Sequence, residues 1–150
     1  MTRWMSLPGE RRNKLGNKKV TVTGINFDSK AEASYYLYLL AEKQAGRVVS
    51  ITLQPVVELQ PHFKRDGKTY RAITYTPDFL VEYRGGRREY IDVKGAATQQ
   101  GELRRKLFLY KVPDIPLRWV SQSQKYSQTG WIDYDELQAI RRKARKDKES

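Results

Sequence analysis

The sequence has 150 residues, of which 39% are hydrophobic and 31% are charged. This length fits one domain with a core of its own, and the composition is that of a globular chain. The absence of cysteine excludes disulfides, thiolate metal sites and a cysteine nucleophile. The only histidine, His62, gives no basis for a zinc site or a histidine general base.

No apolar run approaches the roughly 20 residues that a membrane-spanning helix needs. The first 19 residues are basic, but no apolar stretch follows them, so they do not have the pattern of a secretory signal. We therefore expect a cytoplasmic protein.

The charge is the most informative bulk property. Lys and Arg number 29 against 17 Asp and Glu, which gives a net charge of +12. Such an excess attracts polyanions, either nucleic acid or an anionic membrane surface. Membrane binding requires a basic helix with a bulky apolar face, and segment 133–150 offers only Leu137, Ala139 and Ile140. The charge therefore predicts DNA as the partner and no membrane.

In chain order, residues 1–19 are expected to be a flexible basic arm. Residues 20–25 alternate between apolar and polar and predict a short strand. A helix is expected from 29 to about 45, with Ser29 as N-cap, Glu32 completing a capping box and Gly46 ending it.

The central part of the chain has the patterns of strands, which we expect at 48–53, 56–59, 69–75, 79–83 and 89–94. Asp66-Gly67 predicts a hairpin turn, and Gly85-Gly86 predicts a second turn. A second helix is expected at 101–111, with Leu103, Leu107 and Tyr110 on one side. A further strand at 117–121 precedes a basic helix that Asp133 would cap.

This order predicts an α/β domain with a central mixed sheet flanked by helices and with basic terminal extensions. We divide the chain into an arm at 1–19, a core domain at 20–132 and a C-terminal helix at 133–150.

Two carboxylates, Asp78 and Asp92, lie at the ends of predicted apolar strands, and Lys94 follows the second by two residues. The alternation of a strand places Asp92 and Lys94 on one face. Whether Asp78 joins them depends on the register between strands 79–83 and 89–94.

The apolar face of the first strand is Phe79, Val81 and Tyr83, and that of the second is Ile91 and Val93. Both faces have odd numbers, so burying them together requires paired residues whose numbers sum to an even value. A two-residue Gly85-Gly86 loop gives an odd sum. An odd-length loop, such as Gly85-Gly86-Arg87 with a glycine at positive φ, gives an even one. The hydrophobic pattern therefore predicts that Asp78, Asp92 and Lys94 share a face.

Two adjacent carboxylates are costly unless a cation lies between them or one is protonated. Oxygen ligands of this kind favour Mg²⁺, with Mn²⁺ as a substitute, and a polycationic protein that binds such an ion suggests phosphodiester hydrolysis.

Pro77-Asp78, a spacer of 13 residues and Asp92-Val93-Lys94 resemble the PD-(D/E)XK signature of restriction-endonuclease-like nucleases. Ser29-Lys30-Ala31-Glu32, Gln54-Pro55 and the Tyr-x-x-Asp-Phe stretch at 75–79 are similar to a phage-encoded family of small nucleases related to Holliday junction resolvases. The likeness extends from about residue 24 to 120.

The resemblance implies a restriction-endonuclease-like core and a phage or prophage origin. It also implies metal ligands at Asp78, Asp92, the Val93 carbonyl and Glu32, with Lys94 and Gln54 completing the catalytic set. Other roles remain open for three residues. Glu32 is also explained as a helix cap, Gln54 as a polar strand end, and Lys106 as a partner of Glu102 on the helix surface.

We therefore expect a Mg²⁺-dependent endodeoxyribonuclease that acts on branched or duplex DNA and is either selective for DNA structure, such as a Holliday junction, or weakly selective for sequence. The resemblance implies that its products have 5′-phosphate and 3′-hydroxyl ends. Cleavage of a four-way junction implies a homodimer, whereas a monomer would suit a nickase or a single-strand nuclease. The alternatives are a catalytically silent DNA-binding module and a structural basic protein. The residues expected to contact DNA are Arg104, Arg105, Lys106, Lys111, Arg141 and Arg142.

Overall fold

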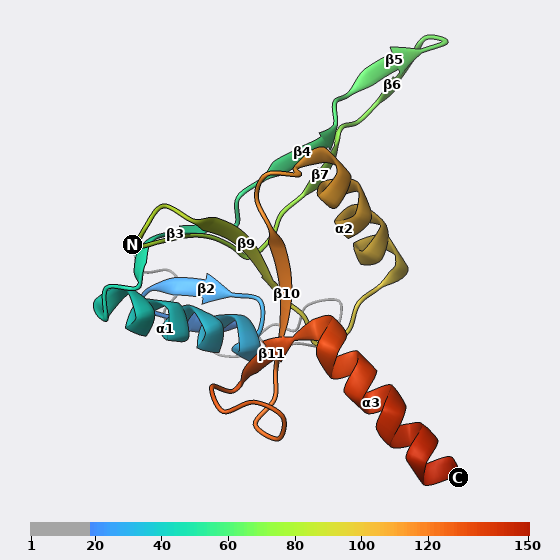
Figure 1. The fold of residues 1–150 in the computed structure, drawn as a ribbon. Helices are drawn as coiled ribbons and strands as arrows, with labels where there is room; N and C mark the ends of the chain where they lie inside the picture. The colour runs from blue at the N-terminus through green and yellow to red at the C-terminus, as the bar shows by residue number, and fades with distance from the viewer. Residues whose placement is uncertain (1–18) are drawn as a thin grey trace. The chain divides into compact units, whose positions relative to one another are not determined.

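The computed structural model describes residues 19–150 and divides the chain into two compact units, Met1–Val48 and Val49–Ser150. The predicted arm at 1–19 therefore lies outside the described residues, apart from its last residue. The described chain is mixed α/β, with a five-stranded mixed sheet and three helices. Figure 1 shows the order of the elements along the chain. No helix among residues 19–150 has the length and apolar character to cross a membrane.

The described part of the first unit contains a hairpin where a single strand was expected at 20–25. Strands β1 (Val20–Val22) and β2 (Ile25–Phe27) pair antiparallel, with Val20 opposite Phe27. Thr23 and Gly24 form the turn, both at positive φ. Turns of this hand match the twist of the strands they join, so Thr23-Gly24 reverses the chain inside a segment whose alternation suggested one strand.

Helix α1 (Lys30–Gln44) follows and confirms the predicted helix within one residue at each end. The Ser29 hydroxyl accepts a hydrogen bond from the Glu32 amide at 3.1 Å, so the predicted N-cap is present. Beyond the helix, Gly46 adopts a φ of 85° and its amide donates to the Lys43 carbonyl, as glycine does at helix ends.

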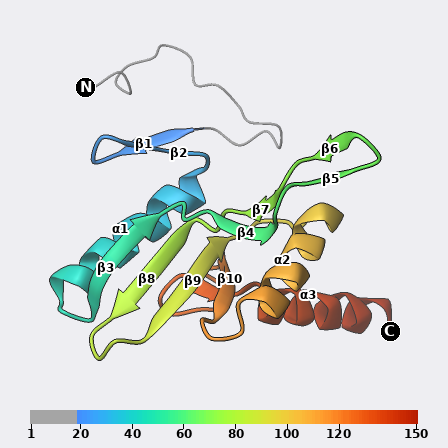
Figure 2. The same cartoon turned by 90° about the horizontal axis from the view of Figure 1, so that it is seen from above.

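The five-stranded sheet has the strand order β11-β10-β9-β8-β3. Its members are β3 (Val48–Leu53), β8 (Phe79–Tyr83), β9 (Arg88–Val93), β10 (Leu117–Gln122) and β11 (Trp131–Asp133). Strands β8 and β9 are antiparallel, β9 and β10 are parallel, and β11 is an antiparallel edge strand that the sequence analysis did not predict. Figure 2 shows β8, β9 and β10 side by side.

The register between β8 and β9 has the even sum that the hydrophobic pattern requires. Phe79 pairs with Ile91, which gives 79 + 91 = 170, and Phe79, Val81 and Ile91 are almost wholly buried on one face. The loop has three residues, as predicted, but it is Arg84-Gly85-Gly86 because the Tyr83 amide donates to the Arg87 carbonyl at 2.8 Å. Both glycines have positive φ, which glycine adopts without steric cost.

Between β3 and β8 the chain makes a two-part antiparallel ribbon. Strands β4 (Val57–Gln60) and β7 (Ile73–Tyr75) form its base, and β5 (Phe63–Arg65) and β6 (Lys68–Tyr70) form its tip around the predicted Asp66-Gly67 turn. The strand expected at 69–75 is therefore two strands. Arg71 and Ala72 interrupt it where the ribbon changes from one small sheet to the next.

Helix α2 (Gln99–Lys111) links the parallel strands β9 and β10 and is capped by Thr98, whose hydroxyl accepts from the Gly101 amide. Leu103, Leu107 and Tyr110 lie on a face that is exposed, with Tyr110 at 88%. The buried position is Phe108, whose ring contacts those of Tyr75 and Tyr90. The buried face of α2 is therefore the one that packs on these two tyrosines, and not the face with Leu103, Leu107 and Tyr110 that the sequence suggested.

Helix α3 (Tyr134–Glu149) begins where it was expected, but the predicted cap is wrong in its chemistry. Asp133 occupies the N-cap position without a side-chain hydrogen bond to the helix. Its carboxylate instead accepts from Arg118 of β10 at 3.1 Å, because the β10–β11 pairing brings that guanidinium next to it.

Candidate active site

Asp92 and Lys94 meet at the carboxyl end of β9, as the alternation of the strand predicts. Asp92 is only 5% exposed, and its Oδ2 lies 3.3 Å from the Lys94 ammonium. A buried carboxylate requires a partner, and this ion pair supplies one.

Tyr75 is a second partner of the same oxygen. Its hydroxyl donates to Asp92 Oδ2 at 2.5 Å and accepts from the Trp119 indole nitrogen at 3.0 Å. Trp119 lies opposite Asp92 in the parallel register of β9 and β10, so the three side chains form a chain of hydrogen bonds across strands. The carboxylate of Asp92 is thereby held in one orientation.

Asp78 comes immediately before β8, and its Oδ2 accepts a hydrogen bond from the Val93 amide at 2.8 Å. Continuing the β8–β9 register by one step places Asp78 opposite Asp92, on the face predicted for it. Because the amide and carbonyl of one strand residue point to the same side, the Val93 carbonyl is directed toward the Asp78 edge as well. The structure therefore brings Asp78, Asp92 and Val93 together.

The pKa of Tyr75 reports the charges at this place. Burial raises it most, and the negative charge of Asp92 and its hydrogen bond raise it further. The negative charge of Asp78 raises this pKa as well, by the smallest of these effects. The Trp119 bond, which favours the phenolate, is a smaller opposing effect. Tyr75 thus remains a protonated donor to Asp92 across the physiological range.

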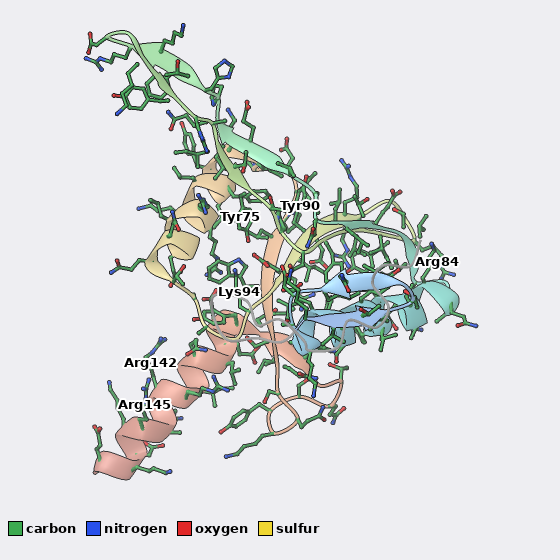
Figure 3. The ribbon with its side chains drawn as sticks, turned by 180° about the vertical axis from the view of Figure 1, so that it is seen from behind. Tyr75, Arg84, Tyr90, Lys94, Arg142 and Arg145 are labelled. Carbon is green, nitrogen blue, oxygen red and sulfur yellow. The ribbon has the colours of Figure 1, made fainter. Side chains whose placement is uncertain are left out.

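Lys94 is held from three directions. Its amide donates to the Val120 carbonyl at 2.7 Å, and its carbonyl accepts from the Ser121 hydroxyl at 2.6 Å. Its ammonium lies 5.0 Å from the centre of the Trp119 ring, within cation–π range. The side chain remains partly exposed, so a ligand can reach the ammonium. Figure 3 labels Tyr75 and Lys94 on the side of the sheet near α2.

Arg105 of α2 also lies over the Trp119 ring, with its guanidinium carbon 4.3 Å from the ring centre. It also forms a two-pronged ion pair with Asp135, which raises the pKa of Arg105 and lowers that of Asp135 through the hydrogen bond. Glu102 contacts Arg105 at 3.8 Å, in place of the pairing with Lys106 that we considered. Arg105 is thus engaged within the protein, and its contact with DNA stays a prediction.

The other predicted residues have different positions. Gln54 is exposed with a φ of 47°, and its amide donates to the Asp78 carbonyl at 2.9 Å, so its backbone adjoins the site. Glu32 lies on α1 in the first unit and is half-buried. Exposed side chains are found at Lys106, Lys111, Arg141 and Arg142, whereas Arg104 is half-buried. Arg142 and Arg145 extend from α3 in Figure 3.

Sequence reasoning missed Tyr75, Trp119 and Ser121 as parts of the site. Trp119 is almost wholly buried, and it contacts Tyr75, Lys94 and Arg105. The available signal for Tyr75 was its place in the Tyr-x-x-Asp-Phe stretch, three residues before Asp78.

The donor set fits a small hard cation with few protein ligands. Within residues 19–150 no group of three or more His, Cys, Asp or Glu is gathered as a metal cage. Mg²⁺ does not need one, because it binds one or two carboxylates and completes its octahedron with water and phosphate. Asp78, Asp92 and the Val93 carbonyl are all oxygen donors, and Tyr75 and Lys94 both bind Oδ2 of Asp92, so Oδ1 takes no part in those bonds.

The site therefore combines a pair of strand-end carboxylates with a partly exposed lysine. The chain matches the family described as "Protein of unknown function (DUF1064)" over residues 12–128, and it belongs to this family. No curated protein and no solved structure matches it. The matched segment contains every residue of the site and ends before α3.

Proposed function

We propose that the chain is a metal-dependent endonuclease that hydrolyses phosphodiester bonds in DNA, with a restriction-endonuclease-like core. The observation that carries the proposal is the approach of Asp78 to the Val93 amide on the strand that presents Asp92 and Lys94. The β9–α2–β10 crossover, which joins parallel strands through a helix, fits such a core. The proposal rests on residues of the second unit alone.

In this proposal Asp78, Asp92 and the Val93 carbonyl would hold Mg²⁺ or Mn²⁺. The ion, when bound, lowers the pKa of a coordinated water and neutralises charge on the scissile phosphate. Tyr75 and Trp119 keep Asp92 in the orientation for binding. Gln54 adjoins Asp78 through its backbone.

Lys94 has the electrostatic role. Its ammonium orients the attacking water and stabilises the negative charge that develops on the phosphorane. The water oxygen bonds to phosphorus while the bond to the 3′ oxygen breaks. One water proton leaves to solvent, and the departing 3′ oxygen takes up a proton from solvent. The products carry 5′-phosphate and 3′-hydroxyl ends, as the resemblance to PD-(D/E)XK nucleases implies.

The test is cleavage of labelled four-way junction, flap, duplex and single-stranded DNA with Mg²⁺ or with EDTA. We expect cleavage of at least one substrate with Mg²⁺, none with EDTA, and none by Asp92→Asn. Asp114→Asn is the matched control, because Asp114 is exposed in the loop between α2 and β10. Cleavage by Asp92→Asn at the wild-type rate would refute the assignment.

The second candidate is a DNA-binding module without catalysis. The observation that favours it is that Lys94 and Tyr75 already satisfy Asp92, so this carboxylate needs no ion for its stability. It predicts salt-sensitive binding without cutting on any substrate, and binding that Asp78→Ala leaves unchanged.

Sedimentation separates the forms of the nuclease. Two symmetric cuts in a four-way junction require a homodimer, whereas a monomer fits a nickase or a single-strand nuclease.

A further inference from the structure

The tip of the ribbon, formed by β5, β6 and their turn, is exposed throughout. Every residue from 60 to 71 is exposed, and this run includes two aromatic residues, Phe63 and Tyr70, each 40% exposed. Both Figure 1 and Figure 2 show this hairpin extending beyond the β4–β7 pair and α2. A hairpin without a core face is only marginally stable by itself, so its amino acids are not explained by packing.

One face of the hairpin, which we call the tip face, consists of Phe63, Arg65, Lys68 and Tyr70. Phe63 is opposite Tyr70 and Arg65 is opposite Lys68, and alternation places both pairs on one side. The two rings stack with their centres 4.8 Å apart and 10° between their planes. The Lys68 ammonium lies 5.1 Å from the centre of the Tyr70 ring.

The pairing of Arg65 with Lys68 is unfavourable for the isolated protein, since like charges directly opposite one another destabilise a hairpin. The nearest acid, Asp66, lies 3.8 Å from Arg65, and both side chains are at least 80% exposed. Such a pair contributes little in water. Lys64 and Arg71 add two further cations to this exposed segment. The arrangement fits a partner that brings negative charge to the tip face.

We propose that the tip face is a DNA-binding arm, in which Arg65 and Lys68 contact phosphates and the Phe63–Tyr70 pair packs against the sugars or bases beside them. A two-stranded ribbon has the width to enter the major groove of duplex DNA, and exposed aromatic rings next to cations are typical of nucleic-acid surfaces. This inference rests on the proposed function only in taking DNA as the polyanion. An anionic membrane fits less well, because two rings make a small apolar surface.

The test measures binding of the full-length chain to a labelled duplex in EDTA, across salt concentrations, so that no cleavage occurs. Each phosphate contact contributes about 0.9 to the slope of log affinity against log salt. We expect Arg65→Ala/Lys68→Ala to weaken binding at 50 mM salt and to reduce the slope by about 2. The ratio of wild-type affinity to the affinity of this double variant should then fall about tenfold between 50 and 200 mM salt.

The matched control is Arg84→Ala/Lys125→Ala, which removes the same charge from exposed positions in two other loops. If the general charge of the protein were responsible, both double variants would behave alike, and that result would overturn the proposal. Tyr70→Ala should lower affinity about fivefold or more with the slope unchanged, because a packing contact releases no counterions. Circular dichroism of each variant shows whether the second unit is intact.

Two further arms separate this proposal from the nuclease proposal. Wild-type binding to phosphatidylserine vesicles but not to DNA overturns the DNA assignment. Adding Mg²⁺ to the same duplex and to a four-way junction then tests cleavage independently. Binding that depends on the tip face, without cleavage of these two substrates or of the flap and single-stranded substrates, supports the arm and refutes the nuclease. If wild type cleaves DNA and the tip-face variants bind DNA as wild type does, the nuclease is supported and the DNA-binding arm is refuted.

Discussion

The substitution Tyr75→Phe removes one hydroxyl from the centre of the site while keeping the ring that packs on Phe108. Two hydrogen bonds are lost, the donation to Asp92 at 2.5 Å and the acceptance from Trp119 at 3.0 Å. A bond to a charged group contributes about 1.5–3 kcal/mol, and a neutral one contributes about 0.5–1.5 kcal/mol. We therefore expect the free energy of unfolding to fall by about 2–4 kcal/mol at pH 7.

Urea denaturation followed by far-ultraviolet circular dichroism measures this change, with Tyr90→Phe as the control. Tyr90 packs on the same Phe108, and among the described residues its hydroxyl has no hydrogen-bond partner. The free energy of unfolding of the control should fall by less than about 0.5 kcal/mol. If the two variants are equally stable, the Tyr75 hydroxyl does not hold Asp92, and the account of the site fails.

The same variant has a defined pH dependence. The folded pKa of Tyr75 is raised, so its contribution to stability is complete below the unfolded pKa of about 10 and declines as the pH rises above that value. The decline is about 1.4 kcal/mol per pH unit for one group. The stability gap between wild type and Tyr75→Phe should therefore shrink above pH 10. A gap that widens there would contradict the direction of the shift.

Three other substitutions test separate features. Lys94→Met should lower the Mg²⁺-dependent cleavage rate at least about 100-fold, because it removes a charge that stabilises the transition state. DNA affinity in EDTA should change less than about threefold, and an unchanged cleavage rate would exclude the electrostatic role of Lys94. Gly86→Ala should lower the free energy of unfolding by about 1–2 kcal/mol in a urea titration because Gly86 has a φ of 94°, whereas Gly95→Ala, with no strained φ and open space around its Cβ position, should cost less. Asp135→Asn removes the ion pair with Arg105, and exposure of the carboxylate limits the loss of stability to less than about 1 kcal/mol. Because the folded pKa of Asp135 is lowered, the loss should be complete above pH 4 and decline as the pH falls through the folded pKa, so thermal melts should show a smaller difference from wild type at pH 3 than at pH 7.

Several features of the fold could be predicted from the sequence because their causes are local. Ser29 caps α1 by accepting a hydrogen bond from the amide of Glu32, three residues further along the chain. Asp66-Gly67 forms the turn of the ribbon because both residues adopt positive φ. The even register of β8 and β9 also follows locally, since the two strands are joined by three residues and each has alternating apolar positions. These rules placed Asp92 beside Lys94 and on the same face as Asp78.

The sequence by itself thus determined the hairpin that presents the carboxylates, because alternation and turn chemistry act over a few residues. Only the tertiary structure decided that Tyr75 reaches Asp92, 17 residues away, and that Trp119 reaches Tyr75, 44 residues away. It also decided that α2 buries Phe108 instead of Leu103 and Leu107. These contacts depend on how separate elements dock, and docking is set by the shapes of surfaces that no short stretch of sequence contains.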